Sequence, residues 1–181
     1  MITNDVLEKA IIFATKKHKG QRRKGNKRPY IMHPISVMNT LYQIKEHSDN
    51  IYLLAAAAIL HDTVEDCGVS LKKIAKKFGY HVASLVEELT LDKNQYEIIG
   101  KTKYLSIHMM SMSSYALCIK LCDRLDNVKD LKSMNSNFRS RYISETKDIL
   151  NYISENRSNI TGTHKVLISM INDVLNSYNT N

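Results

Sequence analysis

"IYLLAAAAILHDTVEDCG", residues 51–68, joins an uncharged run to a dense cluster of ionisable groups. The six positions after residue 60 hold four such groups: His61, Asp62, Glu65 and Asp66. The run is apolar most of the way round a helix, which predicts a central buried helix from Ile51 to Asp66 that Gly68 can end. Buried charges are costly unless they are paired or bind metal, so this helix end predicts compensation nearby. The alternative is that the helix ends in solvent and the acids are hydrated.

Helical periodicity and helix start and stop signals recur along the rest of the chain. Six Gly and two Pro in 181 residues are few, as expected for a mostly helical protein. Only residues 115–122, inside another apolar stripe, resemble a strand. We therefore predict one all-α domain over residues 1–181, a helical bundle around the central helix, with C-terminal helices in 139–178 packed on it. The other expected helices span residues 4–18, 34–44, 71–78, 80–91, 101–111, 139–154 and 164–178.

Charge and cysteine content narrow the class of protein. The net charge is +8, and the segment from Lys16 to Arg28 holds eight Lys or Arg and no acid. This favours a polyanionic partner: nucleic acid, a nucleotide or a membrane surface. No apolar run has transmembrane length and no signal peptide is visible, so we expect a cytoplasmic protein with three reduced cysteines and no membrane association. The lysines at 72, 73, 76 and 77 are interpreted as the outer side of a helix, and His18 as a surface or satisfied histidine.

Two further positions extend the ionisable cluster. "YIMHPI" places His33 just before a helix, and "KLCDRLDN" places Asp123 in a strongly apolar one. With His61 and Asp62 they form a set of two nitrogens and two carboxylates. Such a set suits a divalent first-row ion that keeps open positions for water and substrate. Its oxygen content favours Mn²⁺ or Mg²⁺ over a thiolate Zn²⁺ site.

Several separated motifs carry a resemblance to a known family. "HPISV", "AILHDTVED" and "KLCDRLDNVKDL" resemble the HD-domain hydrolases of the RelA/SpoT group, most closely the stand-alone small alarmone hydrolases related to SpoT. The resemblance covers about residues 5–155 and implies removal of the 3′-pyrophosphate from (p)ppGpp, giving GDP or GTP and pyrophosphate. It also implies one Mn²⁺ ion. The implied ligands are His33, His61, Asp62 and Asp123.

The resemblance further implies roles for residues around the ion. The "ED" pair maps onto Glu65 and Asp66, which we expect to position water and move a proton, without assigning which is acid and which is base. The "RK" pair maps onto Arg23 and Lys24, expected to contact the purine and the phosphates. The remaining two positions implied to line the nucleotide pocket are Asn127 and Thr146.

Other functions stay open at this point. The same metal site would serve a phosphohydrolase for another nucleotide, such as the 2′-phosphate of NADPH or a deoxynucleotide. A non-enzymatic nucleic-acid binder would use the +8 charge, but no helix-turn-helix, zinc-finger or RNP motif supports a stable nucleic-acid complex. The chain ends soon after the hydrolase region, so we expect no synthetase. The last helix either packs onto the domain or mediates a homodimer.

Overall fold

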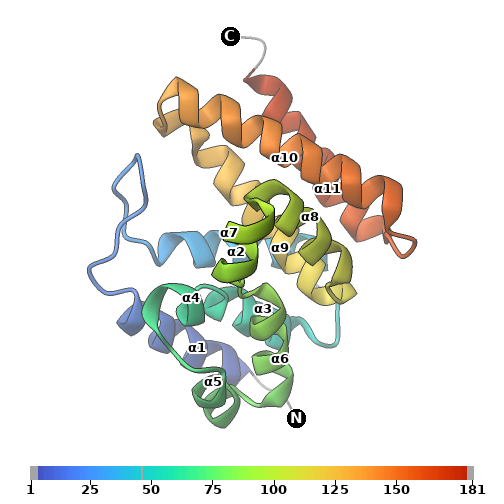
Figure 1. The fold of residues 1–181 in the computed structure, drawn as a ribbon. Coiled ribbons are helices and arrows are strands. Elements are labelled where there is room, and N and C mark those ends of the chain that lie inside the picture. The colour runs from blue at the N-terminus through green and yellow to red at the C-terminus, as the bar shows by residue number, and fades with distance from the viewer. Residues whose placement is uncertain (1–3, 46, 179–181) are drawn as a thin grey trace. The chain divides into compact units, whose positions relative to one another are not determined.

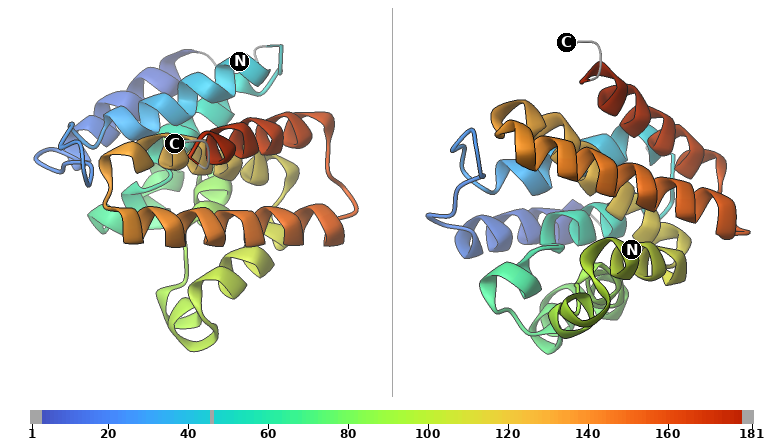
Figure 2. Two further views of the ribbon diagram at one scale, coloured as in Figure 1. Left: turned by 90° about the horizontal axis from the view of Figure 1, so that it is seen from above. Right: turned by 45° about the horizontal axis from the view of Figure 1, so that its top comes forward.

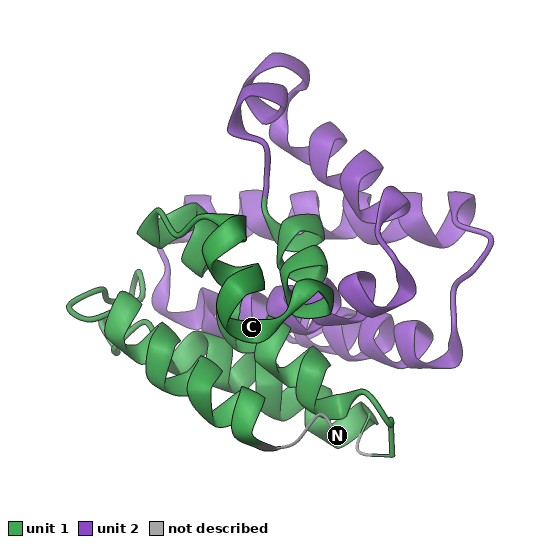
Figure 3. Ribbon diagram, turned by 90° about the horizontal axis from the view of Figure 1, so that it is seen from below, with its two compact units in different colours: residues 1–90 green, residues 91–181 purple. Residues whose placement is uncertain are grey.

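The structure of the protein, a computed structural model, describes residues 4–45 and 47–178 (Figure 1). Within these residues the regular elements are α-helices and one short 3-10 helix, and the β-structure is confined to an isolated bridge between Arg22 and Pro29. The predicted all-α fold class is confirmed. None of the described helices has both the length and the apolarity that a membrane crossing needs. The chain divides into two compact units, residues 1–90 and 91–181 (Figure 3).

The first unit is built around the predicted central helix, α3. This helix packs against α1, α2 and α6 (Figure 1), and every residue from Leu54 to Leu60 is buried. A helix that is apolar on all sides needs neighbours on all sides, which explains its position. The helices of this unit are α1 (Asn4–Lys17), α2 (Met32–Lys45), α3 (Ile51–Leu60), α4 (Thr63–Cys67), α5 (Leu71–Phe78) and α6 (Tyr80–Leu89).

The prediction of one continuous helix from Ile51 to Asp66 is wrong, because the helix breaks at residues 61 and 62. Two side chains bond to carbonyl oxygens that, in a continuous helix, would accept backbone N–H groups one turn later in the chain. His61 Nδ1 lies 2.7 Å from the carbonyl oxygen of Ala58, and Thr63 Oγ1 donates to that of Leu60 at 2.7 Å. Such local side-chain bonds compete with the helical ladder. The break places two ionisable residues on a turn at the end of a buried helix.

The predicted bounds of α5, residues 71–78, are confirmed. Gly68 ends α4 with φ of 62°, a left-handed conformation that glycine adopts without strain. The hydroxyl of Ser70 caps α5 by accepting the backbone N–H of Lys73. Ile74 and Phe78 form the buried face of this short helix.

The second unit is organised by α9, which packs against α10 and α11. Residues 115–122, the stretch that resembles a strand, lie within α9 and are helical. The short helix α7 was not predicted, although Asp92 caps it by accepting the N–H groups of Asn94 and Gln95. Helices α10 and α11 run in opposite directions (Figure 2). The elements of this unit are α7 (Lys93–Ile99), α8 (Lys101–Ser111), α9 (Ser114–Lys129), η1 (Asp130–Ser133), α10 (Ser136–Asn156) and α11 (Gly162–Ser177).

Candidate metal centre

Three of the four expected metal ligands meet in the first unit. His33 lies in the first turn of α2, whereas His61 and Asp62 form the turn between α3 and α4. One donor atom from each lies within 4.8 Å of the other two. The Oδ2 atom of Asp62 is 2.9 Å from Nε2 of His61 and 3.7 Å from Nε2 of His33. Both histidines are buried and Asp62 is half-buried, so the three donors surround one point at the edge of the core.

The hydrogen bonding of His61 suits the role of metal ligand that is expected of it. A carbonyl oxygen can only accept, so the 2.7 Å contact with Ala58 assigns the ring proton to Nδ1. Nε2 then presents its lone pair toward the Asp62 carboxylate, 2.9 Å away. Two electron-rich atoms at this distance repel each other unless a proton or a cation lies with them. A metal-bound histidine commonly donates its second N–H to a backbone carbonyl, so this arrangement fits a divalent cation.

Tyr30 completes the surroundings of the carboxylate and was missed in the sequence. Its hydroxyl donates to Asp62 Oδ2 at 2.7 Å. Its ring packs edge-on against the ring of His33, with centroids 5.7 Å apart, and the guanidinium of Arg23 lies 5.9 Å from the ring centroid. In "PYIMHP" this tyrosine stands three residues before the expected ligand His33, a spacing that does not by itself indicate a role at the metal centre. Tyr30 thus connects an expected substrate residue to an expected metal ligand.

The two expected catalytic carboxylates follow on α4. Glu65 is half-buried and Asp66 is exposed. The backbone N–H of Asp66 donates to the carbonyl of Asp62 at 2.9 Å, so one helical turn fixes the two expected catalytic residues relative to Asp62. The side-chain amide of Gln21 donates to the Asp66 carbonyl at 3.3 Å. The basic loop is therefore attached to the helix that carries both acids.

Gln21 also belongs to a small polar cluster with His18 and Cys67. His18, which is buried, has Nδ1 2.6 Å from Oε1 of Gln21 and 3.4 Å from Sγ of Cys67. Its ring packs against Tyr30 with centroids 4.9 Å apart. Burial, followed by the negative charge of Asp66, raises the pKa of the Cys67 thiol above its ordinary value. The thiol is consequently protonated at neutral pH.

Asp123 belongs to α9 in the second unit, and its contacts there are well defined. One carboxylate oxygen lies 2.9 Å from Nζ of Lys120, and the other accepts the side-chain amide of Asn127 at 2.6 Å. Asp123 and Lys120 are both buried. The other three expected ligands, His33, His61 and Asp62, come together within the first unit.

The expected substrate residues have diverse surroundings. Lys24 is exposed and Arg23 half-buried on the loop between α1 and α2. Thr146 is fully buried in α10, where its hydroxyl donates to the carbonyl of Tyr142 at 2.7 Å and accepts from Arg124 at 3.3 Å. Burial and the Arg124 bond give Thr146 a structural role in addition to any contact with a ligand. The side chain of Asn127 is already oriented by Asp123.

The chain is similar to several known proteins. The HD domain family model matches residues 10–161. The guanosine-3′,5′-bis(diphosphate) 3′-pyrophosphohydrolase MESH1 of Xenopus tropicalis is 36% identical over 86% of this chain and 84% of its own length. The enzyme of the same name from Homo sapiens is 41% identical over 69% of each chain.

Longer relatives and a solved structure extend the comparison. A guanosine-3′,5′-bis(diphosphate) 3′-pyrophosphohydrolase of Aquifex aeolicus is 36% identical over 79% of this chain, which spans only 20% of that relative's length. A solved structure of a metazoan SpoT orthologue that hydrolyses ppGpp superposes with a TM-score of 0.78 and 28% identity, over 96% of this chain and 95% of that one. The His and Asp cluster fits the divalent metal site that HD-domain hydrolases imply. This chain belongs to the HD domain family.

Proposed function

We propose that this protein is a metal-dependent hydrolase that removes the 3′-pyrophosphate from (p)ppGpp, giving GDP or GTP and pyrophosphate. The observation that carries the proposal is the meeting of His33, His61 and Asp62 around one point, next to a helix with two further acids. The relatives named for this activity support the choice of substrate, since they align over most of this chain. The partner is thus a small nucleotide.

For the cofactor we propose one Mn²⁺ ion held by His33, His61, Asp62 and Asp123. The donor set supports this choice because it combines imidazole with carboxylate oxygen and contains no thiolate. The family resemblance supports Asp123 as the ligand from α9, and the family model extends across both units. When bound, such an ion supplies positive charge that polarises a phosphoryl oxygen and acidifies nearby water. Mg²⁺ and Zn²⁺ are the competing ions for a metal titration.

The catalytic work falls to the carboxylates of Glu65 and Asp66. One orients a water molecule and accepts its proton as the water oxygen bonds to the proximal phosphorus of the 3′-pyrophosphate. The bond between that phosphorus and the ribose 3′-oxygen breaks, and a proton from a carboxyl group passes to the departing oxygen. Acid–base help of this kind is worth about 10²–10⁴-fold in rate. The half-buried Glu65 and the exposed Asp66 differ in environment, which suits a division of these two tasks.

Substrate binding is proposed for Arg23, Lys24, Asn127 and Thr146. A nucleotide with two diphosphates needs cationic partners, and the loop segment from Lys16 to Arg28 supplies eight Lys or Arg without an acid. Arg23 lies over the ring of Tyr30, so the loop places a guanidinium close to the ligand carboxylate that Tyr30 contacts. This arrangement favours approach of the phosphates to the metal centre.

We further propose that residues 1–181 form a single hydrolase domain that acts in the cytoplasm. The family model supports one domain because its match, residues 10–161, crosses the boundary between the two units. The three cysteines are all free thiols, which suits a reducing compartment.

The test is to incubate the full chain with ppGpp and Mn²⁺ and to quantify GDP and pyrophosphate. We expect turnover that EDTA abolishes and that Asp62→Asn removes. Glu65→Gln should lower the rate by about 10²-fold or more. The exposed Asp173→Asn serves as a matched control and should be as active as the wild type. Turnover that survives EDTA, or turnover of NADPH or deoxynucleotides with ppGpp left intact, would refute the proposal.

A further inference from the structure

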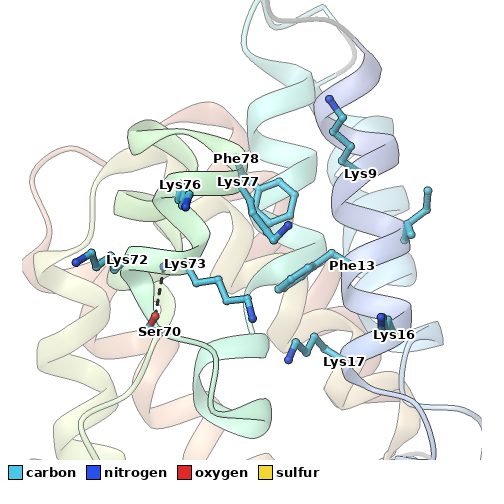
Figure 4. Close-up of a pocket in the computed structure, with 11 residues that line it drawn as sticks. Lys9, Phe13, Lys16, Lys17, Ser70, Lys72, Lys73, Lys76, Lys77 and Phe78 are labelled. Atoms are coloured by element: carbon cyan, nitrogen blue, oxygen red, sulfur yellow. Dashed lines mark hydrogen bonds between the residues drawn. The ribbon is translucent and has the colours of Figure 1, made fainter.

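A lysine-lined cavity of about 1130 Å³ lies between α1 and α5, within the first unit (Figure 4). We call it the lysine groove. One rim carries Lys9, Lys16 and Lys17 of α1, and the other carries the four lysines of α5 between residues 72 and 77. Lys17 and Lys73 reach into the gap from opposite helices (Figure 4). Among the described residues, no acid lines the cavity.

The positive charge of the groove is largely uncompensated. Lys9 bonds to Asp5 at 2.6 Å. In the part of the chain that the structure describes, the other six lysines have no carboxylate within ion-pairing distance. Lysines at 72 and 76, and at 73 and 77, are also four apart on one helix, which is destabilising for like charges. A solvated outer face accounts for the lysines of α5 alone, but not for three more lysines facing them across a cavity.

Three apolar side chains also line the groove, and one of them, that of Ile12, is exposed. Ile12 is 63% exposed, whereas Phe78 is buried and meets the edge of Phe13 at a centroid distance of 5.4 Å. The ammonium groups of Lys17 and Lys77 lie 5.8 and 5.9 Å from the Phe13 centroid. These lysines occupy the aromatic surface that a stacked base would need. The ligand therefore combines negative charge with an apolar group that is not a nucleobase.

We propose that the lysine groove is a docking site for an acidic amphipathic segment of a partner protein. Apolar side chains of the segment contact Ile12, and its Asp and Glu residues face the two lysine rims. The cavity, at about 1130 Å³, is at least as large as ordinary small-molecule sites of roughly 300–1,000 Å³, and its lining extends along two helices. The α1 rim from Lys9 to Lys16 extends about 10 Å, two helical turns, which suits a helix laid in a groove.

Two other occupants fit the observations less well. A second copy of this chain carries the same net charge of +8, so its approach to the lysine groove is repelled. An anionic bilayer is flat, whereas the two lysine rims lie on separate helices with a cavity between them. Charge complementarity and shape thus both favour an acidic segment.

The test uses the full chain and a dye-labelled synthetic peptide of about four helical turns, with Leu at i, i+3, i+4 and i+7 spacing and Glu elsewhere. A scrambled peptide of equal composition lacks the apolar face. By fluorescence anisotropy we expect the patterned peptide to bind at least about tenfold more tightly than the scrambled one. Lys73→Glu/Lys76→Glu should weaken binding by about tenfold or more, and Ile12→Ala by about threefold to tenfold.

A matched control is Lys93→Glu/Lys103→Glu, which makes the same charge change at two exposed lysines of the second unit. It should bind the patterned peptide as the wild type does, and thermal unfolding should show that all variants are folded. Equal binding of both peptides, or no effect of Ile12→Ala, would overturn the proposal in favour of a site for polyanions in general. Tighter binding to phosphatidylserine vesicles than to the peptide, lost in Lys73→Glu/Lys76→Glu, would overturn it in favour of a membrane surface.

Discussion

At the scale of single residues, the Oδ2 atom of Asp62 is the meeting point of the candidate centre. It accepts the Tyr30 hydroxyl, and the Nε2 atoms of two buried histidines lie close to it. Tyr30 in turn packs against His18 and His33. The orientation of the carboxylate therefore depends on a hydroxyl that is not itself a metal ligand.

Removing that hydroxyl should weaken metal binding without unfolding the protein. In Tyr30→Phe the ring and its packing remain, but Asp62 loses a 2.7 Å hydrogen bond. Outer partners of metal ligands are typically worth about 10–100-fold in affinity, so we expect a loss of at least about tenfold for Mn²⁺. Isothermal titration calorimetry measures it. Tyr80→Phe, at a side chain that is 79% exposed, is the control and should bind Mn²⁺ normally. Unchanged affinity in Tyr30→Phe would show that the carboxylate is oriented without the hydroxyl.

The thiol of Cys67 should react slowly in the folded protein. Burial and the charge of Asp66 raise its pKa above the ordinary value of 9.0, so the reactive thiolate is scarcer at pH 7 than in a free cysteine. Iodoacetamide labelling followed by mass spectrometry should be slow at pH 7 and should accelerate as the pH rises above 9. Unfolding in urea should restore the rate of an ordinary cysteine. Fast labelling at pH 7 without urea would contradict the described surroundings of this thiol.

At the scale of residues, the sequence identified the expected metal ligands but not the neighbouring residue that orients one of them. His33, His61 and Asp62 could be selected because ionisable residues beside apolar helices require compensation. Tyr30 could not be selected in the same way, since a tyrosine beside a basic loop has many ordinary roles. Its function became visible only when the loop was placed next to the turn between α3 and α4.

At the scale of elements, the course of the chain through residues 51–68 decides where the acids point. The apolar pattern predicted a buried helix, which is found, but that helix ends at Leu60, and Gly68 ends the next helix, α4. The break at residues 61 and 62 was not predicted, because hydropathy does not record that His61 and Thr63 bond to backbone carbonyls of the preceding turn. Helix α7 was missed since seven residues without a buried face give no periodic signal.

Replacing Gly68 should destabilise the protein through backbone strain. Its φ of 62° is unfavourable for a residue with a Cβ, although no atom lies within 4 Å of where that Cβ would be. We expect Gly68→Ala to lower the free energy of unfolding by about 1 kcal/mol. Gly162→Ala is the matched control, with equal space but no positive φ, and should cause no loss. Urea denaturation compares the two variants, and equal stability would exclude strain at residue 68.

Arg157 should be a major stabilising residue of the second unit. It is 7% exposed, and its guanidinium donates to the carbonyls of Met109, Met110 and Met112 at 2.9, 2.9 and 2.7 Å. These bonds satisfy carbonyls at the end of α8 that have no helical partner. We expect Arg157→Met to lower the free energy of unfolding by about 2–4 kcal/mol. Urea denaturation is the measurement. The exposed Arg141→Met should change it by less than about 0.5 kcal/mol, and a similarly small effect in Arg157→Met would contradict this role.

At the scale of the whole molecule, the family model matches as one region a chain whose contacts form two compact units. The contacts separate residues 1–90 from 91–181, while the family model matches residues 10–161 without interruption. Like the family match, the proposed ligand set includes residues of both units: His33, His61 and Asp62 belong to the first and Asp123 to the second. Helical periodicity predicted helices in both units, although it missed α7 and the break between α3 and α4. The sequence marked Asp123 as an ionisable residue in an apolar helix, and the order of the family motifs related it to the other three expected ligands.

The most direct test of the proposed metal centre is a crystal structure of the full chain soaked with Mn²⁺, with anomalous data collected at the manganese absorption edge. We expect one strong peak at coordination distance, about 2 Å, from Nε2 of His33 and His61 and from carboxylate oxygens of Asp62 and Asp123. A peak at other residues, or a peak at the two histidines with Asp123 still bound to Lys120 and away from the ion, would contradict a centre built from these four ligands.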